Sequence, residues 1–532
     1  MQQRTWRLAT VVAATALVVT GCTAGETADD ATPAPDDTGS ATEAVTPTEA
    51  GTASDSDSEA PASGDASVIL GFAADPLNLD FTTTDGAAIP EALLVNVYEG
   101  LVKVDQSGEI VPALATDWEV SEDGTTYTFT LAEGVTFSNG DEFTAEDAKF
   151  SIERVQSDDW TVSLKAGMDV VESVEAPSDT ELVVTLAQPS NSWLYAMTTR
   201  IGAMFSTDGV DDLATTAIGT GPYEVTNFVQ GDRLEFTRRD DYWGEAPAYA
   251  DVTFRYFDDG NALNNALLGD DIDVVATVQA PEAMGQFEDT EDYQVIEGTS
   301  QGEVVLSLNN TNPPLDDVRV RQAIRYAIDN EAVRATAWAG YGTMIGSMVP
   351  PTDPWYEDLT EMYPLDLDQA TALLEEADAT DITLDFKVPN LPYAVNAAQT
   401  VQSNLAQVGI TAEIETLEFP AVWLEDVFTN FDYHMSIIAH VEPRDISAFA
   451  NPDYYFQYDS ADVQQLLADA DTGSPEEQVE LTAQAARTIS EDAAAEFLFL
   501  APNLLVANQS VTGLPENRVG EAFDLTDLAP AG

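Results

Sequence analysis

A serine between two glycines is the first feature of this sequence whose spacing suggests chemistry. Gly298-Thr-Ser300-Gln-Gly302 matches the G-x-S-x-G pattern of hydrolase nucleophiles, and two histidines lie downstream in hydrolase order. That pattern requires a strand before the serine and a helix after it, so that the hydroxyl stands exposed. Here strand-like residues lie on both sides, at 293–297 and 303–308. We therefore expect a bend between strands and no enzyme, with a serine hydrolase that uses Ser300 as the less favoured alternative.

The two histidines do not form a recognisable metal site. His434 and His440 lie an even number of residues apart, so they would share a face of a continuous strand. Metal ligation would need further donors, and the sequence contains neither HExxH nor CxxC. We expect His434 to be a half-buried structural residue. We expect no metal and no cofactor, because the sequence also lacks a complete dinucleotide or Walker motif.

Cys22 is the only cysteine of the 532 residues, and it follows a short apolar segment. Two basic residues precede residues 8–20, which are apolar or small and too few to span a bilayer. This arrangement is typical of a secretory signal peptide, here residues 1–21. Val19-Thr20-Gly21-Cys22 resembles a bacterial lipobox, which predicts acylation of the Cys22 thiol. We therefore expect an extracytoplasmic protein that a lipidated N-terminal cysteine anchors to the cell membrane.

The residues after Cys22 differ in composition from the rest of the chain. Residues 23–66 consist almost entirely of Ala, Thr, Ser, Pro, Gly, Asp and Glu, which cannot bury apolar surface. We interpret residues 22–66 as the lipidated cysteine and a disordered acidic tether. The whole chain has 95 acidic and 19 basic residues, so nothing could neutralise phosphates and nucleic acid is excluded as a partner. We interpret the net charge of −76 as a heavily solvated surface.

The folded part mixes predicted strands and helices. Alternating apolar residues and Asn139-Gly140 predict a hairpin over 127–137, and Thr144 with Asp147 predicts a capped helix that ends near 155. Asp316 or Asp317 could cap a helix over 318–339. The remaining predicted elements are a helix over 395–408, strands over 410–417 and 433–439, and helices over 463–470 and 476–490. The mixture favours an α/β or α+β chain with more than one lobe.

Three long segments resemble one known family in content and in order. They are NVYEGLVKVDQSGEIVPALATDWEVSEDGTTYTFTLAEGVTFSNGDEFTAEDAKFSIERV at 96–155, GTGPYEVTNFVQGDRLEFTRRDDYWG at 219–244 and LNNTNPPLDDVRVRQAIRYAIDNEAV at 308–333. Together they resemble the extracellular solute-binding proteins of family 5, the peptide- and nickel-type receptors that feed ABC transporters.

The resemblance implies an α/β, two-lobed periplasmic-binding-protein-like fold with a subdivided first lobe and hinge crossover strands. The first lobe would comprise residues 67–296, with 500–532 returning to it. Residues 297–303 would form a hinge crossover, and 304–496 the second lobe. Ligand sites form preferentially in a cleft between lobes, and closure around the ligand is a known switching mode.

The resemblance also implies an anchor for the ligand. In peptide-binding relatives an acid in the loop after strand 433–439 pairs with the amino terminus of the peptide, and Glu442 falls at that position. The tryptophan of that loop is absent here, and Arg444-Asp445 replaces the usual Asp-Pro pair. The alternative is that Glu442 pairs with Arg444 at the surface.

Four further residues are expected near the ligand. His440 and Asp445 would be second-line contacts, and Tyr341 and Met344 of a glycine-rich loop could pack on an apolar part of the ligand. The expected partners are a peptide or other small solute and the permease subunits of an ABC importer, and we expect the receptor itself to be a monomer. A receptor for a metal chelate, with His434 or His440 contacting the bound species, is the alternative on the same fold.

Overall fold

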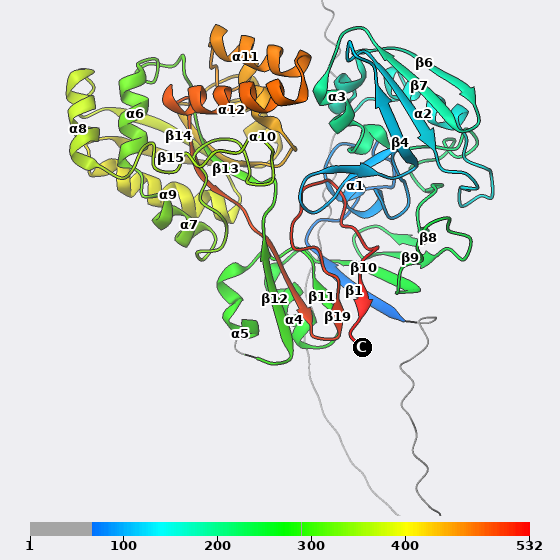
Figure 1. The fold of residues 1–532 in the computed structure, drawn as a ribbon. Helices are drawn as coiled ribbons and strands as arrows, with labels where there is room; N and C mark the ends of the chain where they lie inside the picture. The colour runs from blue at the N-terminus through cyan, green and yellow to red at the C-terminus, as the bar shows by residue number, and fades with distance from the viewer. Residues whose placement is uncertain (1–65, 289) are drawn as a thin grey trace, which may run out of the picture. The chain divides into compact units, whose positions relative to one another are not determined.

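The computed structural model describes residues 66–288 and 290–532 (Figure 1). The predicted signal peptide, Cys22 and nearly all of the tether lie outside these residues. Within them, no helix has both the length and the apolar character to cross a bilayer.

A seven-stranded sheet forms around the first strand of the described chain. Its order is β12 (Tyr293–Gly298), β18 (Asn503–Asn508), β11 (Val274–Val275), β1 (Ser67–Phe72), β10 (Asp251–Tyr256), β9 (Arg233–Arg238) and β8 (Tyr223–Val229). β1 is parallel to both β10 and β11, and the other pairs are antiparallel. Helix α4 (Gly260–Leu268) makes the crossover that two parallel strands require, and the Asp259 carboxylate caps it by accepting from the Ala262 N–H at 2.9 Å.

A four-stranded antiparallel sheet is inserted between β1 and β8. Its order is β4 (Ala115–Val120), β5 (Thr126–Leu131), β7 (Glu181–Leu186) and β6 (Val171–Ser178). Helix α2 (Ala145–Gln156) packs on β6 and β7. The smaller elements around it are α1 (Ala88–Leu93), β2 (Val102–Val104), β3 (Ile110–Pro112), α3 (Asn191–Ala196), and 3₁₀ turns at Ser163–Met168 and Arg200–Gly202.

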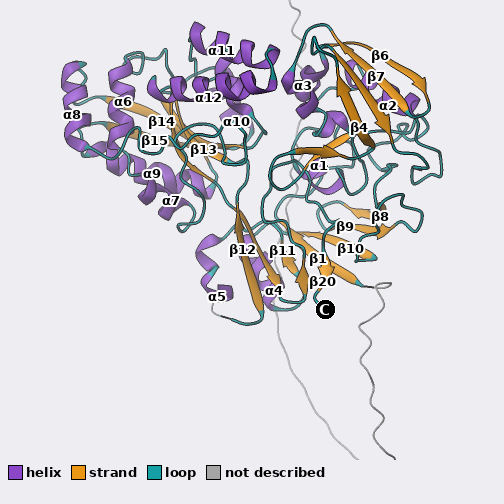
Figure 2. Cartoon of the chain, in the orientation of Figure 1, coloured by secondary structure: helices purple, strands orange, loops and turns teal. Residues whose placement is uncertain are grey.

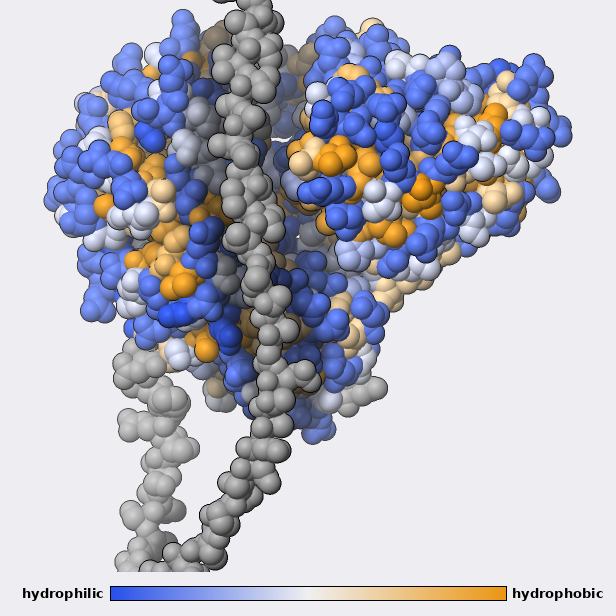
Figure 3. All heavy atoms as spheres, turned by 180° about the vertical axis from the view of Figure 1, so that it is seen from behind, coloured by the Kyte–Doolittle hydropathy of each residue, from blue (hydrophilic) through white to orange (hydrophobic). Residues whose placement is uncertain are grey.

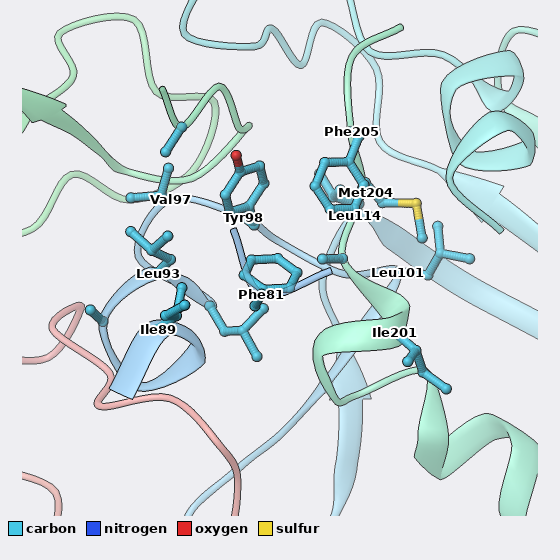
Figure 4. Packing of buried hydrophobic residues seen from close by; sticks show 14 of the residues in the cluster. Phe81, Ile89, Leu93, Val97, Tyr98, Leu101, Leu114, Ile201, Met204 and Phe205 are labelled. Carbon is cyan, nitrogen blue, oxygen red and sulfur yellow. The ribbon is translucent and has the colours of Figure 1, made fainter. Parts of the chain in front are cut away.

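An aromatic cluster fixes α1 and the turn at Arg200–Gly202 (Figure 4). The ring centroid of Tyr98 lies 5.4 Å from that of Phe81 and 5.1 Å from that of Phe205. Figure 4 shows Ile89 and Leu93 of α1 next to Phe81, and Ile201 of the turn belongs to the same apolar cluster at some distance from the rings. The cluster therefore positions two segments whose neighbouring residues line the cavity described below.

A five-stranded sheet carries the second large core. Its order is β15 (Thr411–Leu417), β14 (Thr383–Pro389), β16 (Met435–His440), β13 (Glu303–Leu308) and β17 (Ala495–Leu500). β13 is buried along its whole length, as expected for a strand covered on both faces. Val304 and Leu306 belong to one apolar core and Val305 to another, because successive side chains of a strand point to opposite faces.

Helices cover both faces of this sheet (Figure 2). One face packs against α6 (Val318–Ala327), α7 (Asn330–Ala337), α8 (Leu367–Glu376) and α9 (Pro392–Ala406). The other packs against α10 (Ala421–Trp423), the π-helical turn Leu424–Thr429, α11 (Ala461–Thr472) and α12 (Pro475–Glu491), with a 3₁₀ turn at Asp445–Ala450 near the last two.

The chain passes between the two large sheets twice among the described residues, from β12 to β13 and from β17 to β18. The two passes are hydrogen bonded to each other. The Ala501 N–H donates to the Gly302 carbonyl at 2.7 Å, and the Ser300 hydroxyl donates to the Ala501 carbonyl at 2.5 Å. Beyond β18, strand β19 (Val511–Thr512) pairs with β20 (Ala529–Pro530). Residues of this C-terminal segment pack on the apolar core shared by the seven-stranded and four-stranded sheets. Helix α5 (Gly285–Glu288) precedes β12.

Several predicted elements are confirmed. The Asp147 carboxylate accepts from the Thr144 N–H at 3.0 Å and completes the capping box of α2. Helix α9 ends before Gly409, which has a φ of +85°, and β15 follows. Helices α11 and α12 occupy the two predicted C-terminal helical segments.

Two local predictions are wrong. β5 pairs with β4 and β7, and the Asn139-Gly140 turn closes only one isolated bridge, between Thr136 and Glu142. The single helix predicted over 318–339 is two helices, because Asp329 accepts from the Ala332 N–H at 3.0 Å and starts α7 as a new helix. The apolar pattern continues past Asp329, so helical periodicity alone does not predict a break there. An aspartate that can cap a new helix is the feature of the sequence that does.

The surface agrees with the composition. The face opposite to that of Figure 1 is mostly hydrophilic, with apolar side chains in scattered patches (Figure 3). This is the solvated surface that an excess of acidic residues favours.

Candidate functional site

A cavity of about 1290 Å³ lies where the two sheets meet. Its wall includes both connecting segments, at 300–302 and 501–504, and residues that follow β1 and β11. Ligands of open α/β sheets bind outside the carboxyl ends of parallel strands, so this position fits a binding site. Small-molecule pockets usually measure roughly 300–1,000 Å³, so the space suits a solute larger than a single amino acid.

Charged side chains of both signs line the cavity. The carboxylates are Asp85, Glu91, Glu442, Asp471 and Glu521, and the guanidinium groups are Arg200, Arg444 and Arg518. The whole chain has only 19 basic residues, so three arginines in one cavity are a notable concentration.

Two of these arginines are paired with acids. The Arg200 Nε donates to the Glu521 Oε1 at 2.6 Å, and the Arg200 backbone N–H donates to the Glu521 Oε2 at 2.7 Å. The Arg518 Nη1 lies 2.8 Å from the Glu91 Oε1. Burial raises the pKa of Glu91, although the charge of Arg518 lowers it. These pairs fix the wall and leave little charge available to a ligand.

Glu442 lies on the wall without a cationic partner. It follows β16, it is open to the water of the cavity, and no arginine, lysine or histidine nitrogen among the described residues lies within 4.0 Å of its carboxylate. Burial by the surrounding protein raises the pKa of Glu442, and the charge of Asp85 adds to this, while Arg200 lowers it. The alternative in which Glu442 pairs with Arg444 is therefore wrong in this structure.

Arg444 is held by two aromatic rings instead. Its guanidinium carbon lies 3.6 Å from the ring centroid of Tyr195 on α3 and 4.8 Å from that of Trp355. The Asp353 Oδ1 lies 3.9 Å from the Arg444 Nε, which is too far for a hydrogen bond. Burial lowers the pKa of Arg444, and Tyr195 and Asp353 raise it.

His440 and Asp445 lie behind this wall and do not line it. The His440 Nε2 is 2.9 Å from the Tyr455 hydroxyl, and the Nδ1 is 3.6 Å from the Asp445 Oδ2. Burial lowers the pKa of His440 to about 4, so the imidazole is neutral at pH 7. Burial also raises the pKa of Asp445, and the charges of Glu442 and Asp353 act in the same direction. Their predicted role as second-line contacts stays a prediction.

A second buried carboxyl group adjoins this pair. Glu303 lies directly opposite His440 in the β13–β16 register, and its side chain is buried. Burial raises the pKa of Glu303 well above its usual range, with the charge of Asp445 as the next cause. Residues 441–444, which follow β16, are called the binding loop below. The side chains of His440, Asp445 and Glu303 behind it form a polar layer.

Tyr341 and Met344 also lie outside the cavity wall. The Tyr341 hydroxyl donates to a carboxylate oxygen of Glu288 on α5, and Met344 packs on the core that contains α6–α9. The Gly342 N–H donates to the Glu297 Oε1 at 3.0 Å. In this structure their loop therefore links the two sheets and contributes no wall, and their predicted ligand contact is untested.

The described residues contain neither an exposed serine nucleophile at Gly298–Gly302 nor a cluster of metal ligands. Ser300 lies between β12 and β13, with a strand on each side, and its hydroxyl is bonded to a backbone carbonyl. The His434 Nδ1 accepts from the Asp385 N–H at 3.1 Å, as a structural histidine does. Residues 66–288 and 290–532 contain no group of three or more His, Cys, Asp or Glu that could hold a metal ion.

Sequence reasoning missed several wall residues: Tyr195, Trp355, Arg200, Glu521 and Arg518. They come from three parts of the chain that are far apart in the sequence, so no single motif brings them together. The one available signal was the scarcity of arginine in so acidic a chain.

A cavity that is lined by charges of both signs and lies between two sheets joined by two chain segments is typical of a protein that binds a small solute. The sequence supports this assignment: residues 109–461 match the family model of bacterial extracellular solute-binding proteins, family 5 Middle. The chain therefore belongs to this extracytoplasmic family, which serves ABC importers and is not enzymatic, and the predicted family is confirmed.

Known relatives agree with the family. The dipeptide-binding protein of Escherichia coli (strain K12) is 28% identical over 371 residues, which cover 64% of this chain and 68% of that protein. The glutathione-binding protein GsiB of Salmonella paratyphi A is 27% identical over 350 residues, with the same two shares.

Solved structures show the same fold. DppA from Helicobacter pylori in complex with the peptide STSA has a TM-score of 0.76 at 23% identity, over 88% of this chain and 98% of that one. NikA from Brucella suis in complex with Fe(III)-EDTA has a TM-score of 0.77 at 22% identity, over 88% and 100%. The predicted mixed α/β, periplasmic-binding-protein-like fold is confirmed.

The buried carboxyl beside Arg444 predicts a pH-dependent stability. Burial raises the pKa of Asp353 from 3.8 to about 6, although Arg444 lowers it. When the pKa of an acid is higher in the folded protein than in the unfolded chain, the protonated acid favours the folded state. This contribution to the free energy of unfolding is complete below the unfolded-state pKa and is lost as the pH rises through the folded-state pKa. Asp353→Asn should therefore match the wild type near pH 4 and exceed it in stability at pH 8, by up to ~3 kcal/mol.

Melting temperatures between pH 4 and pH 8 test this prediction. Asp258→Asn, at an exposed loop position outside the cavity, is the matched control and should follow the wild type at every pH. A constant difference between Asp353→Asn and the wild type would contradict the assigned cause.

Proposed function

We propose that this protein is a lipid-anchored receptor that captures a peptide or peptide-like solute in the cavity and delivers it to an ABC permease. The observation that carries the proposal is Glu442, a carboxylate on the cavity wall with no cationic partner within 4.0 Å among residues 66–288 and 290–532. An ammonium group is the natural counterion, because charge-assisted hydrogen bonds are strongest where water is excluded. The names of relatives support a peptide: a dipeptide-binding protein and a protein in complex with STSA. We do not propose a metal-chelate receptor, because neither His434 nor His440 lines the cavity.

We further propose that the two sheet regions are the lobes of this receptor. Residues 67–296 with 500–532 would form the first lobe and 304–496 the second, with 297–303 as a crossover. In support, polar contacts join the start of α3 to the end of α11, and Ser192, Ala470 and Asp471 of these segments line the cavity. The Asn191 Nδ2 donates to the carbonyls of Ala470 and Gly473, both at 2.9 Å, and the Asp471 Oδ1 accepts from the Ser192 N–H at 2.9 Å.

Replacement of Glu442 tests the ammonium contact. Glu442→Gln keeps the shape and removes the charge, so the binding of trialanine should weaken by ~1.5–3 kcal/mol. N-acetyl-trialanine lacks the ammonium and should bind both proteins equally. Isothermal titration calorimetry at low salt measures all four affinities, with exposed Glu413→Gln as the control. Equal affinity of Glu442→Gln and the wild type for trialanine would remove Glu442 as the anchor.

Replacement of Asn191 tests closure. Asn191→Ala removes two hydrogen bonds that exist only when α3 and α11 meet, so it should disfavour the closed form by ~1–2 kcal/mol. Affinity for trialanine should then fall by about five- to thirtyfold, although Asn191 does not line the cavity. Asn265→Ala on the exposed face of α4 is the control and should bind normally. If Asn191→Ala binds as tightly as the wild type, these contacts do not contribute to closure.

Replacement of Cys22 tests the anchor. Cys22→Ser removes the thiol that a lipid would acylate, so the protein should leave the membrane fraction while its affinity for trialanine stays unchanged. Fractionation of cells followed by immunoblotting measures the distribution. A serine variant that stays with the membrane would show that another part of the chain holds it there.

A further inference from the structure

Arg444 lies on the cavity wall and, among the described residues, makes no hydrogen bond, although the Asp353 carboxylate is within ion-pair distance of its Nε. Among the described residues, no acceptor lies within hydrogen-bond distance of the Arg444 guanidinium, and its nearest carboxylate is 3.9 Å away at Asp353. The Arg444 Nε is buried without a partner. An unsatisfied buried donor is costly, and the cost of a charged one is larger. Arg200 and Arg518, on the same wall, are bonded to Glu521 and Glu91.

The surroundings hold this guanidinium in one orientation. The guanidinium carbon lies 3.6 Å from the ring centroid of Tyr195 and 4.8 Å from that of Trp355. The contact between a cation and an aromatic face is favourable. The backbone of Arg444 has a φ of +58°, a left-handed conformation that costs roughly 1–2 kcal/mol in a residue other than glycine. A guanidinium fixed in this way presents its edge N–H groups as a planar fork, which matches a carboxylate.

The neighbouring anchor limits the solutes that fit. Glu442 and Arg444 carry opposite charges, line the same cavity and are separated only by Pro443, yet they do not pair. Their Cα atoms are at most about 7 Å apart, because consecutive Cα atoms are separated by 3.80 Å. A solute with an ammonium and a carboxylate a few bonds apart could neutralise both.

We propose that Arg444 binds a carboxylate of the solute beside the ammonium on Glu442, so that the receptor prefers an acidic amino-terminal residue. This inference rests on the proposed function, since it takes Glu442 as the ammonium anchor. Two kinds of compound share the required chemistry. One is a peptide that begins with glutamate, and the other is a γ-glutamyl compound, whose α-ammonium and α-carboxylate are on one carbon.

Four dipeptides separate these sources. α-Glu-Ala and γ-Glu-Ala carry the additional carboxylate, while Gln-Ala and Ala-Ala keep the ammonium and lack it. We expect the full-length wild type to bind at least one glutamyl compound about tenfold or more tightly than Gln-Ala. The better of the two identifies the source.

Substitution of the arginine completes the test. Arg444→Gln should weaken the binding of the glutamyl compound far more than the binding of Gln-Ala, and so abolish the preference. Arg444→Lys keeps the charge without the fork, so part of the preference should remain. Arg255→Gln is the control, because the guanidinium of Arg255 also lies over a ring, that of Phe257, but outside the cavity. Calorimetry gives the affinities, and thermal melting shows whether each variant is folded.

The outcomes distinguish the inference from the function on which it rests. Equal weakening of all four dipeptides by Arg444→Gln would mean that Arg444 only joins Tyr195 to Trp355, and would overturn the inference. If the wild type binds Gln-Ala and the glutamyl compounds equally, the inference fails, while a weaker Glu442→Gln variant would still support the proposed function. If neither trialanine nor any dipeptide binds the wild type, both fail, and if trialanine alone binds, only the inference fails. If Arg444→Gln does not fold, loss of the preference in Arg444→Lys supports the inference and an unchanged preference contradicts it.

Discussion

The pair of chain segments that connects the two large sheets is the constraint on which the rest of the structure depends. The Ala501 N–H and the Gly302 carbonyl bond one segment to the other at 2.7 Å. A Cβ at Gly298 would lie 1.6 Å from the carbonyl oxygen of Glu516, so only glycine allows the first segment to pass there. The residues that resemble a nucleophile motif therefore serve a close backbone crossing. Because both segments belong to the cavity wall, they also place the cavity at the junction of the sheets.

The polar layer beneath the binding loop is unusual in its chemistry. Glu303 and Asp445 have buried carboxylate oxygens without a hydrogen-bond partner among the described residues. Such groups cost stability, and proteins retain them mostly near functional sites. Burial favours the neutral form of both acids and of His440. Of the charged residues in this part of the chain, Glu442 and Arg444 line the cavity, whereas Glu303 and Asp445 do not.

Local chemistry in the sequence predicted several helix ends, although not the break before Asp329, and it predicted strand partners poorly. The capping box at Thr144 and the glycine at 409 act over a few residues, so a single sequence contains all the information needed. The partners of β5 are distant in sequence, and the hairpin prediction failed because an Asn-Gly turn need not join two long strands. The family resemblance predicted the fold class, and it led to Glu442. Trp355 and Tyr195 escaped notice, because only tertiary packing brings them to Arg444.

The cavity wall has aromatic side chains although the binding loop lacks the tryptophan that the family resemblance implies. The absence of that tryptophan would by itself suggest a different kind of ligand. The structure supplies Tyr195 from α3 and Trp355 from a loop that precedes α8, and both line the cavity. The guanidinium of Arg444 lies against both rings, and the backbone of Arg444 has a left-handed conformation. A favourable cation–π contact offsets part of that strain. The loop therefore places a charged group beside two aromatic rings on the cavity wall, and for this reason we propose that the charge pattern of the solute, more than its apolar surface, determines recognition.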